Sequence, residues 1–286
     1  MKVCTIKDFN QQFPDEDACL EWLKNHLYPD GIKCPKCKKI TKHHRIKGRT
    51  AYSCDICGSH TFPMAKTILR KSTTPLRSWM YAIYLIASTR CGISAKQLQR
   101  ELGVTYKTAW RMFTQIRDLL NEAKQPLNGQ VEVDETYIGG KKQGKRGRGA
   151  EGKSKVIGAA QRKGKVVAQV VDDVRMHTII PFTVRNVDRN AVLFTDEFPS
   201  YDHMARYGFN HLKIRHHDKE YVRGKVHTNN IEGFWSLVKR GISGVYHSVS
   251  PKYLQSYLNE YAFRYNHRKD ETPMFETILA RLGVPE

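Results

Sequence analysis

The stretch that we expect to constrain the fold most strongly is His227-Thr-Asn-Asn-Ile-Glu-Gly-Phe-Trp-Ser-Leu-Val-Lys-Arg240. Two polar residues that favour a helix start, Thr228 and Asn229, precede apolar residues at helical spacing. On such a helix Glu232 and Lys239 lie seven positions, or about two turns, apart and therefore share one face. The sequence thus predicts an amphipathic helix that presents an acid and a base together.

Two further carboxylates stand at or near the ends of apolar runs earlier in the chain. Asp134 lies in Val131-Glu-Val-Asp-Glu-Thr-Tyr-Ile138, and Asp196 ends the run Ala191-Val-Leu-Phe-Thr-Asp196, with 35 residues between it and Glu232. A fold can bring two strand-end aspartates and one helical glutamate together, and three such carboxylates can hold two magnesium ions about 3.5–4 Å apart. A pocket of this kind is typical of phosphoryl-transfer chemistry on nucleic acid.

Composition narrows the class of protein. The 286 residues include 48 Lys and Arg against 28 Asp and Glu, a net charge of +20, which favours a polyanionic partner such as nucleic acid. No apolar run approaches the roughly 20 residues that a membrane span needs, and the first residues lack the apolar core of a signal peptide. We therefore expect an intracellular protein without a membrane partner, whose seven cysteines serve as metal ligands or free thiols.

Four of the cysteines have the spacing of a metal site. Cys34-Pro-Lys-Cys37 and Cys54-Asp-Ile-Cys57 are two Cys-x-x-Cys pairs with sixteen residues between them. Each pair places two thiolates within reach of one ion, and four thiolates close a tetrahedron around zinc. The sequence predicts a zinc ribbon with one structural zinc and no open catalytic position. Basic residues between the pairs fit a surface that faces DNA and fit an ordinary solvated surface equally well.

A helix, a glycine turn and a second helix follow the ribbon. Residues 94–102 and 105–119 have helical patterns, and Gly103 separates them. This order is typical of a helix-turn-helix, whose second helix enters the major groove of DNA. Tyr106, Lys107 and Arg111 would then be the exposed residues that read the DNA. A plain helical hairpin is the alternative interpretation.

A glycine-rich basic segment covers residues 139–155, directly after the strand that carries Asp134. We interpret it as a loop that binds phosphates beside the first aspartate, and the alternative is a solvated hairpin tip. The residues that we expect to contact DNA here are Lys141, Lys142, Lys145, Arg146 and Arg148.

The order of elements predicts a multidomain protein. We expect an N-terminal helix and zinc ribbon over residues 1–72, a helix-turn-helix region over 73–125, and an α/β domain with a mixed sheet over 126–286. Predicted strands cover residues 131–138, 156–162, 166–172, 191–198 and 211–215, with helices near 177–184 and 201–207 before the stretch described above.

These motifs together resemble one known family. The segments that carry the resemblance are Pro29-Asp-Gly-Ile-Lys-Cys-Pro-Lys-Cys37, Gly92-Ile-Ser-Ala-Lys-Gln-Leu-Gln-Arg-Glu-Leu-Gly103, Tyr106-Lys-Thr-Ala-Trp-Arg-Met112, Val133-Asp-Glu-Thr-Tyr-Ile-Gly-Gly140 and His227-Thr-Asn-Asn-Ile-Glu-Gly-Phe-Trp235. The chain resembles, almost from end to end, insertion-sequence DDE transposases of the ISXO2-like group, which have an N-terminal zinc ribbon and an integrase-type, ribonuclease-H-like catalytic domain.

The resemblance implies roles for particular residues. Asp134, Asp196 and Glu232 would be the acidic triad for two Mg²⁺ or Mn²⁺ ions, and Lys239 would be the basic residue beyond the glutamate. Relatives in this group can have asparagine at the third position, so Asn229 and Asn230 are alternatives or supplements to Glu232. Two neighbouring acids are expected to stand outside the site: Glu135 because it points to the other side of its strand, and Asp202 because it follows its strand.

The resemblance also implies an activity and partners. The protein would bind the terminal inverted repeats of an insertion sequence, cleave DNA at its ends and join the 3′-ends to target DNA. Double-stranded DNA would be the partner, with a homodimer or larger assembly on the DNA, in the nucleoid of a bacterial or archaeal cytoplasm. Two alternatives remain: a catalytically inactive DNA-binding regulator derived from a transposase, and a magnesium-dependent nuclease without strand transfer.

Overall fold

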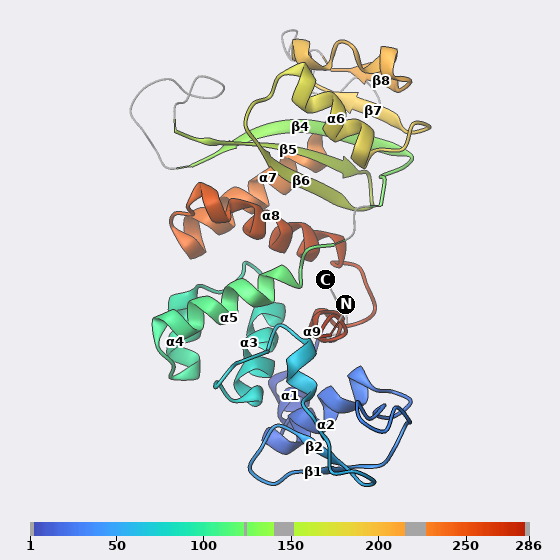
Figure 1. Cartoon of the computed structure of the whole chain (residues 1–286). Helices are drawn as coiled ribbons and strands as arrows, with labels where there is room; N and C mark the ends of the chain where they lie inside the picture. Colours follow the sequence, from blue (N-terminus) through green and yellow to red (C-terminus); the bar gives the residue numbers. More distant parts are fainter. Residues whose placement is uncertain (1–2, 123–124, 140–151, 215–226, 284–286) are drawn as a thin grey trace. The chain divides into compact units, whose positions relative to one another are not determined.

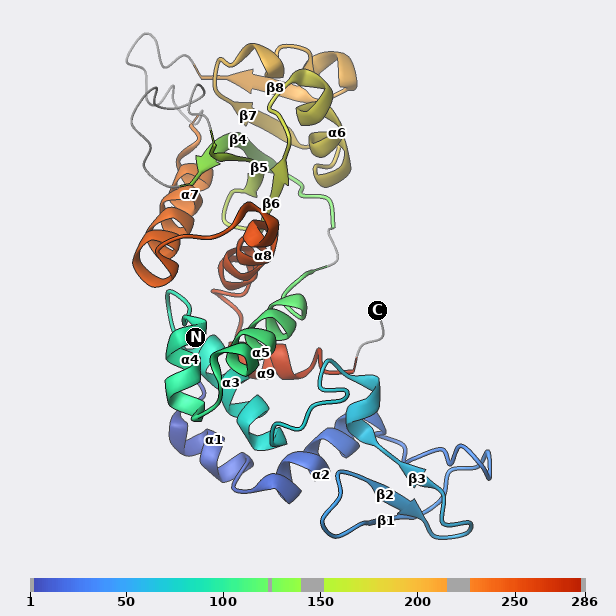
Figure 2. The ribbon, with the colours of Figure 1, turned by 60° about the vertical axis from the view of Figure 1, so that its left-hand side comes forward.

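The chain divides into two compact units. The computed structural model describes residues 3–122, 125–139, 152–214 and 227–283. One unit consists of Met1–Leu119 together with Asp270–Glu286, and the other is Leu120–Lys269 (Figures 1 and 2). This division differs from the predicted boundaries in two respects. The ribbon and the helix-turn-helix share one unit, and the last segment, which we assigned to the α/β domain, belongs to the N-terminal unit.

The N-terminal unit combines helices with a small antiparallel sheet. Its helices are α1 (Ile6–Gln12), α2 (Glu16–Leu27), α3 (Leu76–Ser88), α4 (Ala95–Leu102), α5 (Tyr106–Asp118) and α9 (Met274–Leu279). Its strands are β1 (His43–Arg45), β2 (Tyr52–Cys54) and β3 (His60–Thr61), in the order β1-β2-β3. Helix α1 was not predicted, although Thr5 and Asp8 form a capping box at its start.

An aromatic cluster ties α9 to the first helices of this unit. The Phe9 ring lies 5.6 Å from Phe13, 5.2 Å from Tyr84 and 6.0 Å from Phe275, measured between ring centroids. Phe9 and Phe13 are fully buried, and Phe275 is 2% exposed. Residues from opposite ends of the chain therefore form one core.

The predicted helix-turn-helix elements are present as α4 and α5. Ser94 caps α4 by accepting the backbone N–H of Gln97 at 3.1 Å, and Thr105 caps α5 by accepting that of Thr108 at 3.2 Å. Between the helices Gly103 adopts a left-handed conformation with φ 62°, which glycine reaches without steric cost.

The second unit contains a five-stranded mixed sheet. Its strands are β4 (Gln130–Ile138), β5 (Ser154–Gln161), β6 (Val166–Val171), β7 (Val192–Thr195) and β8 (Asn210–Lys213). The spatial order is β6-β5-β4-β7-β8. Strands β4, β5 and β6 pair antiparallel, whereas β7 and β8 run parallel to β4. This arrangement, with the first strand in the centre, is that of the ribonuclease-H-like fold and agrees with the predicted fold class.

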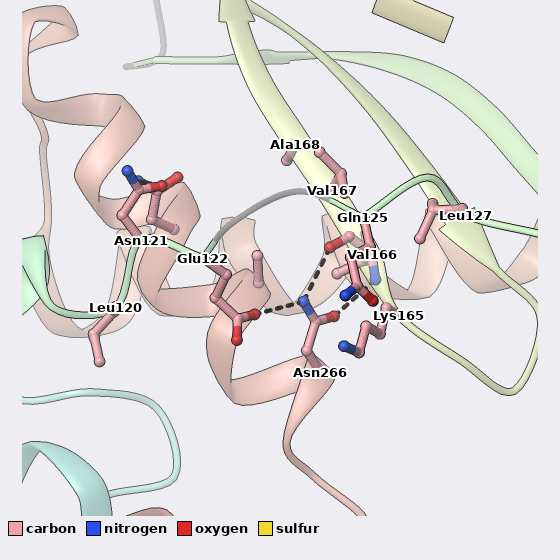
Figure 3. A pocket seen from close by; sticks show the side chains of 12 residues that line it. Leu120, Asn121, Glu122, Gln125, Leu127, Lys165, Val166, Val167, Ala168 and Asn266 are labelled. Atoms are coloured by element: carbon pink, nitrogen blue, oxygen red, sulfur yellow. Dashed lines mark hydrogen bonds between the residues drawn. The ribbon is translucent and has the colours of Figure 1, made fainter. Parts of the chain in front are cut away.

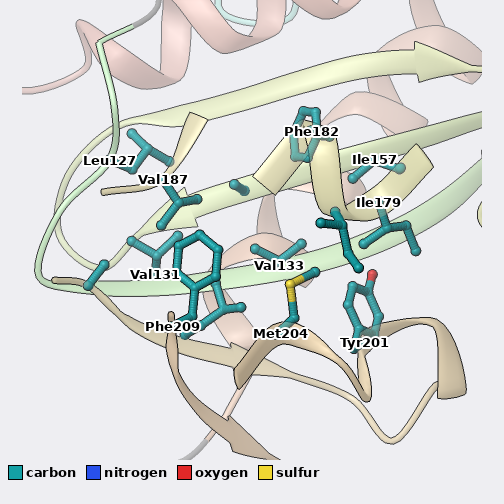
Figure 4. Close-up of a cluster of buried hydrophobic side chains, with 14 residues drawn as sticks. Leu127, Val131, Val133, Ile157, Ile179, Phe182, Val187, Tyr201, Met204 and Phe209 are labelled. Atoms are coloured by element: carbon teal, nitrogen blue, oxygen red, sulfur yellow. The ribbon is translucent and has the colours of Figure 1, made fainter. Parts of the chain in front are cut away.

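Helices cover both faces of this sheet. Helix α6 (Met176–Asn186) lies on one face, and α7 (Asn229–Gly241) and α8 (Pro251–Asn266) lie on the other (Figure 1). The core on the α6 side is closed by two short 3-10 turns, η3 (Pro199–Tyr201) and η4 (Met204–Tyr207), where we had predicted one helix (Figure 4). Tyr201 and Met204 from these turns are fully buried in that core.

Amide side chains from α8 cover the edge strand β6. Asn266 accepts the backbone N–H of Val166 at 2.7 Å and donates to its carbonyl at 3.2 Å (Figure 3). Gln255 accepts the N–H of Val170 at 2.8 Å and donates to the carbonyl of Ala168 at 3.1 Å. These bonds satisfy backbone N–H and C=O groups of the edge strand that could otherwise pair with another strand.

Candidate functional site

The four cysteines of the ribbon form a compact cluster. The Sγ atoms of Cys34, Cys37, Cys54 and Cys57 all lie within 4.8 Å of one another. Two of these distances are 3.5 Å, between Cys34 and Cys57, and 4.0 Å, between Cys37 and Cys54. A tetrahedral zinc with bonds of about 2.3 Å places its sulfurs about 3.8 Å apart. The observed distances bracket that value, so the cluster fits zinc.

The surroundings of the thiols favour a bound cation. The hydroxyl of Thr41 lies 3.2 Å from Cys54 Sγ and lowers the pKa of Cys54 to about 6. The sulfur of Cys57, in contrast, raises the pKa of Cys37 to about 12. Four sulfurs this close therefore cannot all ionise without a compensating positive charge, which a divalent metal supplies.

The two predicted aspartates meet on adjacent central strands of the five-stranded sheet. Asp134 lies in β4, and Asp196 follows the last residue of β7. The parallel pairing of the two strands aligns Glu132 with Phe194, so its continuation places Asp134 beside Asp196. Carboxylate oxygens of the two residues lie within 4.8 Å of each other. Sheet order therefore brings together two acids that are distant in the sequence.

A third acid in this group is Glu135, which we had expected to stand apart. One of its carboxylate oxygens lies within 4.8 Å of an oxygen from each aspartate. The residue is 8% exposed, and the hydroxyl of the buried Tyr201 donates to its Oε2 at 2.8 Å. The alternation of side chains along a strand fixes the direction of Cβ, but a glutamate is long enough for its carboxylate to approach both aspartates.

The pKa of the Asp134 carboxyl is raised by its surroundings in this group. Burial, together with the negative charges of Glu135, Asp196 and Glu232, raises its pKa to about 7. The indole Nε1 of Trp235 donates to Asp134 Oδ2 at 3.1 Å. Clustered carboxylates that repel one another at neutral pH are suited to bind a divalent cation, which removes the repulsion. The donor set therefore fits Mg²⁺ or Mn²⁺.

Glu232 lies in the first turn of α7, as predicted, but not in the group of mutually close ligand atoms. Its side chain is exposed and accepts a hydrogen bond from the hydroxyl of Thr228 at 2.7 Å. Thr228 thus bonds to the glutamate and makes no side-chain cap of the helix. The charge of Glu232 nevertheless raises the pKa of Asp134, which places it near the same site.

Two lysines also act on this site. Partial burial lowers the pKa of Lys239, and the charge of Asp134 acts on it in the opposite direction. The charge of Lys153 lowers the pKa of Lys239 as well, so the two cations lie near each other. Lys153 was not singled out in the sequence because it stands in the long basic segment. The side chains of Lys141, Lys142, Lys145, Arg146 and Arg148 lie outside the described residues.

A buried glutamate holds the start of α7 against the sheet. Glu132 is fully buried and accepts the backbone N–H groups of Asn230 and Ile231 at 2.8 and 3.1 Å. The Asn230 side chain donates to the same carboxylate at 2.8 Å, and Arg162 forms an ion pair with it at 2.8 Å. The amide of Asn230 therefore docks the helix. Asn229, the first residue of α7, is exposed.

The predicted DNA-reading residues are on the exposed side of α5. Tyr106, Lys107 and Arg111 are exposed, whereas Ala109 and Phe113 are buried. Arg111 also donates to the hydroxyl of Ser72 at 3.3 Å. The exposed side of the second helix is thus free of the apolar side chains that hold the pair of helices together.

Comparisons with known proteins identify two domains in the chain. Residues 126–266 match the ISXO2-like transposase domain, and residues 14–60 match the transposase zinc-ribbon domain. The chain therefore belongs to the ISXO2-like transposases that carry an N-terminal zinc ribbon.

Two curated proteins and a solved structure are similar to part or most of the chain. An uncharacterized protein in transposable element ISH50 of Halobacterium salinarum is 27% identical over 93% of this chain and 97% of its own length. An uncharacterized transposase-like protein of Haemophilus influenzae is 29% identical over 37% of this chain and 84% of its own length. The Mos1 strand transfer complex matches 70% of this chain and 73% of that chain, with 12% identity and a TM-score of 0.32. Among the described residues, no helix is long and apolar enough to cross a membrane.

Proposed function

We propose that this transposase binds the terminal inverted repeats of an insertion sequence, cleaves DNA at the element's ends and joins the 3′-ends to target DNA. The observation that carries the proposal is the meeting of Asp134 and Asp196 on adjacent parallel strands, with their carboxylate oxygens within 4.8 Å. A catalytically inactive DNA-binding regulator would need no such cluster of partly buried acids, and so the cluster favours the enzyme.

Asp134, Asp196 and Glu232 are the residues that we propose to hold two Mg²⁺ or Mn²⁺ ions. A divalent metal bound there would activate the attacking water or the 3′-hydroxyl of DNA and stabilise the leaving oxygen. Lys239 holds a DNA phosphate near the carboxylates as a point charge. Lys153, close to Lys239, adds positive charge on the same side. Glu132 contributes indirectly, because it fixes the start of the helix that carries both Glu232 and Lys239.

The N-terminal unit supplies recognition in this proposal. Cys34, Cys37, Cys54 and Cys57 hold one structural zinc, and Tyr106, Lys107 and Arg111 on α5 contact base edges in the major groove. Contacts to phosphate provide much of the affinity, in keeping with the net charge of +20. Because both ends of an element must be joined, we expect a homodimer or larger assembly on DNA.

The test is single-turnover cleavage of a duplex that contains one element end, with Mg²⁺ and with strand transfer followed on a second duplex. The parent should cleave and transfer. Glu232→Gln should lose cleavage by a factor on the order of 10² or more while it keeps its affinity for the end. Asn230→Ala should be milder, because its side chain contacts Glu132.

Glu135→Gln is the comparison that decides between the two glutamates. We expect it to retain more cleavage than Glu232→Gln, because Tyr201 holds the Glu135 carboxylate from the core side. If Glu232→Gln cleaves like the parent and Glu135→Gln is inactive, Glu135 completes the site and our triad is wrong. Cleavage without transfer would indicate a nuclease, and end binding without cleavage a regulator.

A further inference from the structure

The residue opposite Asp134 in the sheet is a glycine with a tryptophan lying on it. Asp134 of β4 pairs with Gly158 of β5. A Cβ atom added at position 158 would lie 2.6 Å from Cζ2 and Cη2 of Trp235 and 3.0 Å from Ile231 Cδ1. Contacts of 2.6 Å are shorter than carbon atoms tolerate, so a side chain at this position would displace the indole. The absence of a side chain at Gly158 thus makes room for the ring.

The same ring bonds to the catalytic-site carboxylate. Trp235 is 3% exposed, and its Nε1 donates to Asp134 Oδ2 at 3.1 Å. Trp235 lies three residues after Glu232, on the helix that also carries Lys239. The indole therefore connects the strand that carries Asp134 to the helix that carries the other two proposed site residues.

We propose that Trp235 is a positioning residue that fixes the plane of the Asp134 carboxylate for metal binding, and that Gly158 provides the space this requires. The inference rests on the proposed function of the carboxylate site. A carboxylate held at one oxygen cannot rotate freely, so less conformational freedom is lost when a cation binds. Hydrogen bonds of this kind to ligating carboxylates typically change metal affinity or activity by about 10–100-fold.

Packing alone explains the burial of Trp235 but does not require its N–H to meet a carboxylate. Asp134 is the only acid in the group to which the indole N–H is seen to donate in the described part of the chain. A purely structural role predicts that loss of the N–H affects stability alone, whereas a positioning role predicts a change in metal affinity at unchanged stability.

The test removes the N–H and keeps the shape of the ring. Trp235 is replaced in the full-length protein by β-(3-benzothienyl)alanine, in which sulfur stands where tryptophan has N–H. Binding of Mn²⁺ to the DNA-free protein is measured by electron paramagnetic resonance, together with thermal unfolding. We expect Mn²⁺ affinity to fall by roughly 10-fold, with the unfolding temperature close to that of the parent. Cleavage should then need about 10-fold more metal.

Trp79 provides a matched control. It is fully buried in the N-terminal unit, and its Nε1 donates to Ser72 Oγ at 2.9 Å. The same replacement at Trp79 should leave Mn²⁺ affinity unchanged. Gly158→Ala is a second variant, which keeps the N–H but displaces the ring, and it should weaken Mn²⁺ binding as well.

Three results would overturn the inference. One is parent-like Mn²⁺ affinity in the Trp235 replacement. Another is a Gly158→Ala protein that unfolds at a lower temperature but binds Mn²⁺ like the parent. The third is a parent that binds no Mn²⁺, which also removes the carboxylate site. A parent that binds Mn²⁺ with the predicted dependence on Trp235 but cuts no element end would contradict the proposed function alone.

Discussion

The cysteine cluster and the carboxylate cluster are assembled in opposite ways. The four cysteines lie in two tight turns of one small ribbon, each pair separated by two residues. Asp134 and Asp196 come from strands that β5, β6 and α6 separate in the chain and that become neighbours only in the folded sheet. The first site is thus encoded by local spacing, and the second by the order of strands.

This difference has consequences for what each site depends on. A metal held by local turns stabilises the turns themselves, because a small ribbon buries little apolar surface. A carboxylate site on a packed sheet is held by the core on both of its faces and stores repulsion between its charges. We therefore expect ligand loss to damage folding in the first unit and chemistry in the second.

The largest effect should follow from Cys54→Ser. A structural zinc contributes on the order of 10 kcal/mol in small zinc domains at neutral pH, and three remaining thiolates cannot close the tetrahedron. Elemental analysis should find about one zinc per chain in the parent and far less in the variant. The N-terminal unit should unfold at a lower temperature while the sheet of the second unit persists. Cys91→Ser, at an exposed cysteine outside the cluster, is the control. Full zinc occupancy in Cys54→Ser would contradict the four-cysteine site.

Asp196→Asn should have the next largest effect, on chemistry and not on folding. Loss of one charged ligand should reduce single-turnover cleavage by a factor on the order of 10³, or about 4 kcal/mol. Zinc content and affinity for the element end should remain at the parent level. Asp202→Asn removes a nearby exposed acid that pairs with Lys213 and should cleave normally. Equal cleavage by Asp196→Asn and Asp202→Asn would remove Asp196 from the site.

The sequence predicted the parts of the molecule that local patterns encode. The two cysteine pairs, the helices around Gly103 and the apolar runs that end near Asp134 and Asp196 could all be recognised before the fold was known. Glu135 could not be placed, because the pleat rule concerns the direction of Cβ and not the reach of a long side chain. Between residues 201 and 207 the apolar spacing suggested a helix, whereas the chain forms two 3-10 turns.

Contacts between residues that are distant in the sequence could not be predicted either. Nothing in the local sequence of Glu132 indicates that it accepts hydrogen bonds from the start of α7, nearly a hundred residues later. Trp235 fits the apolar stripe of a helix, and its contact with Asp134 depends on the pairing of β4 with Gly158 in β5. Helical periodicity also gives no indication that Phe275 packs against Phe9 in the N-terminal core.

The third prediction concerns the packing of Phe275 in the N-terminal unit. Phe275→Ala should destabilise the N-terminal unit by about 3–5 kcal/mol, because it removes a buried ring that contacts Phe9, Phe13 and Tyr84. Leu258→Ala, at a fully buried side chain of α8 in the second unit's core, should instead destabilise the second unit. Hydrogen exchange, measured as the temperature rises, distinguishes the unfolding of one unit from that of the other. A fragment that ends at residue 125 should unfold at a lower temperature than the same fragment fused to residues 270–286. Equal stability of the two fragments would show that the C-terminal segment is dispensable for this core.

The smallest effect should be a gain of stability in the metal-free carboxylate site. The pKa of Asp134 is about 7 in the folded protein, above the ordinary value of 3.8, so the folded state binds more protons than the unfolded state between these values. The contribution of Asp134 to stability is therefore greatest at low pH and is lost as pH rises through this window. Asn cannot ionise, so the free energy of unfolding of Asp134→Asn should match that of the parent near pH 4. It should exceed the parent's by about 2 kcal/mol at pH 8, since neighbouring carboxylates share the proton.

Unfolding in denaturant with chelator, repeated across pH, measures the difference, and Asp172→Asn at an exposed acid of the same unit is the control. Added Mn²⁺ should reverse the order, because only the parent gains from the ion. A stability difference that stays constant from pH 4 to pH 8 would mean that Asp134 is not under repulsion from its neighbouring carboxylates.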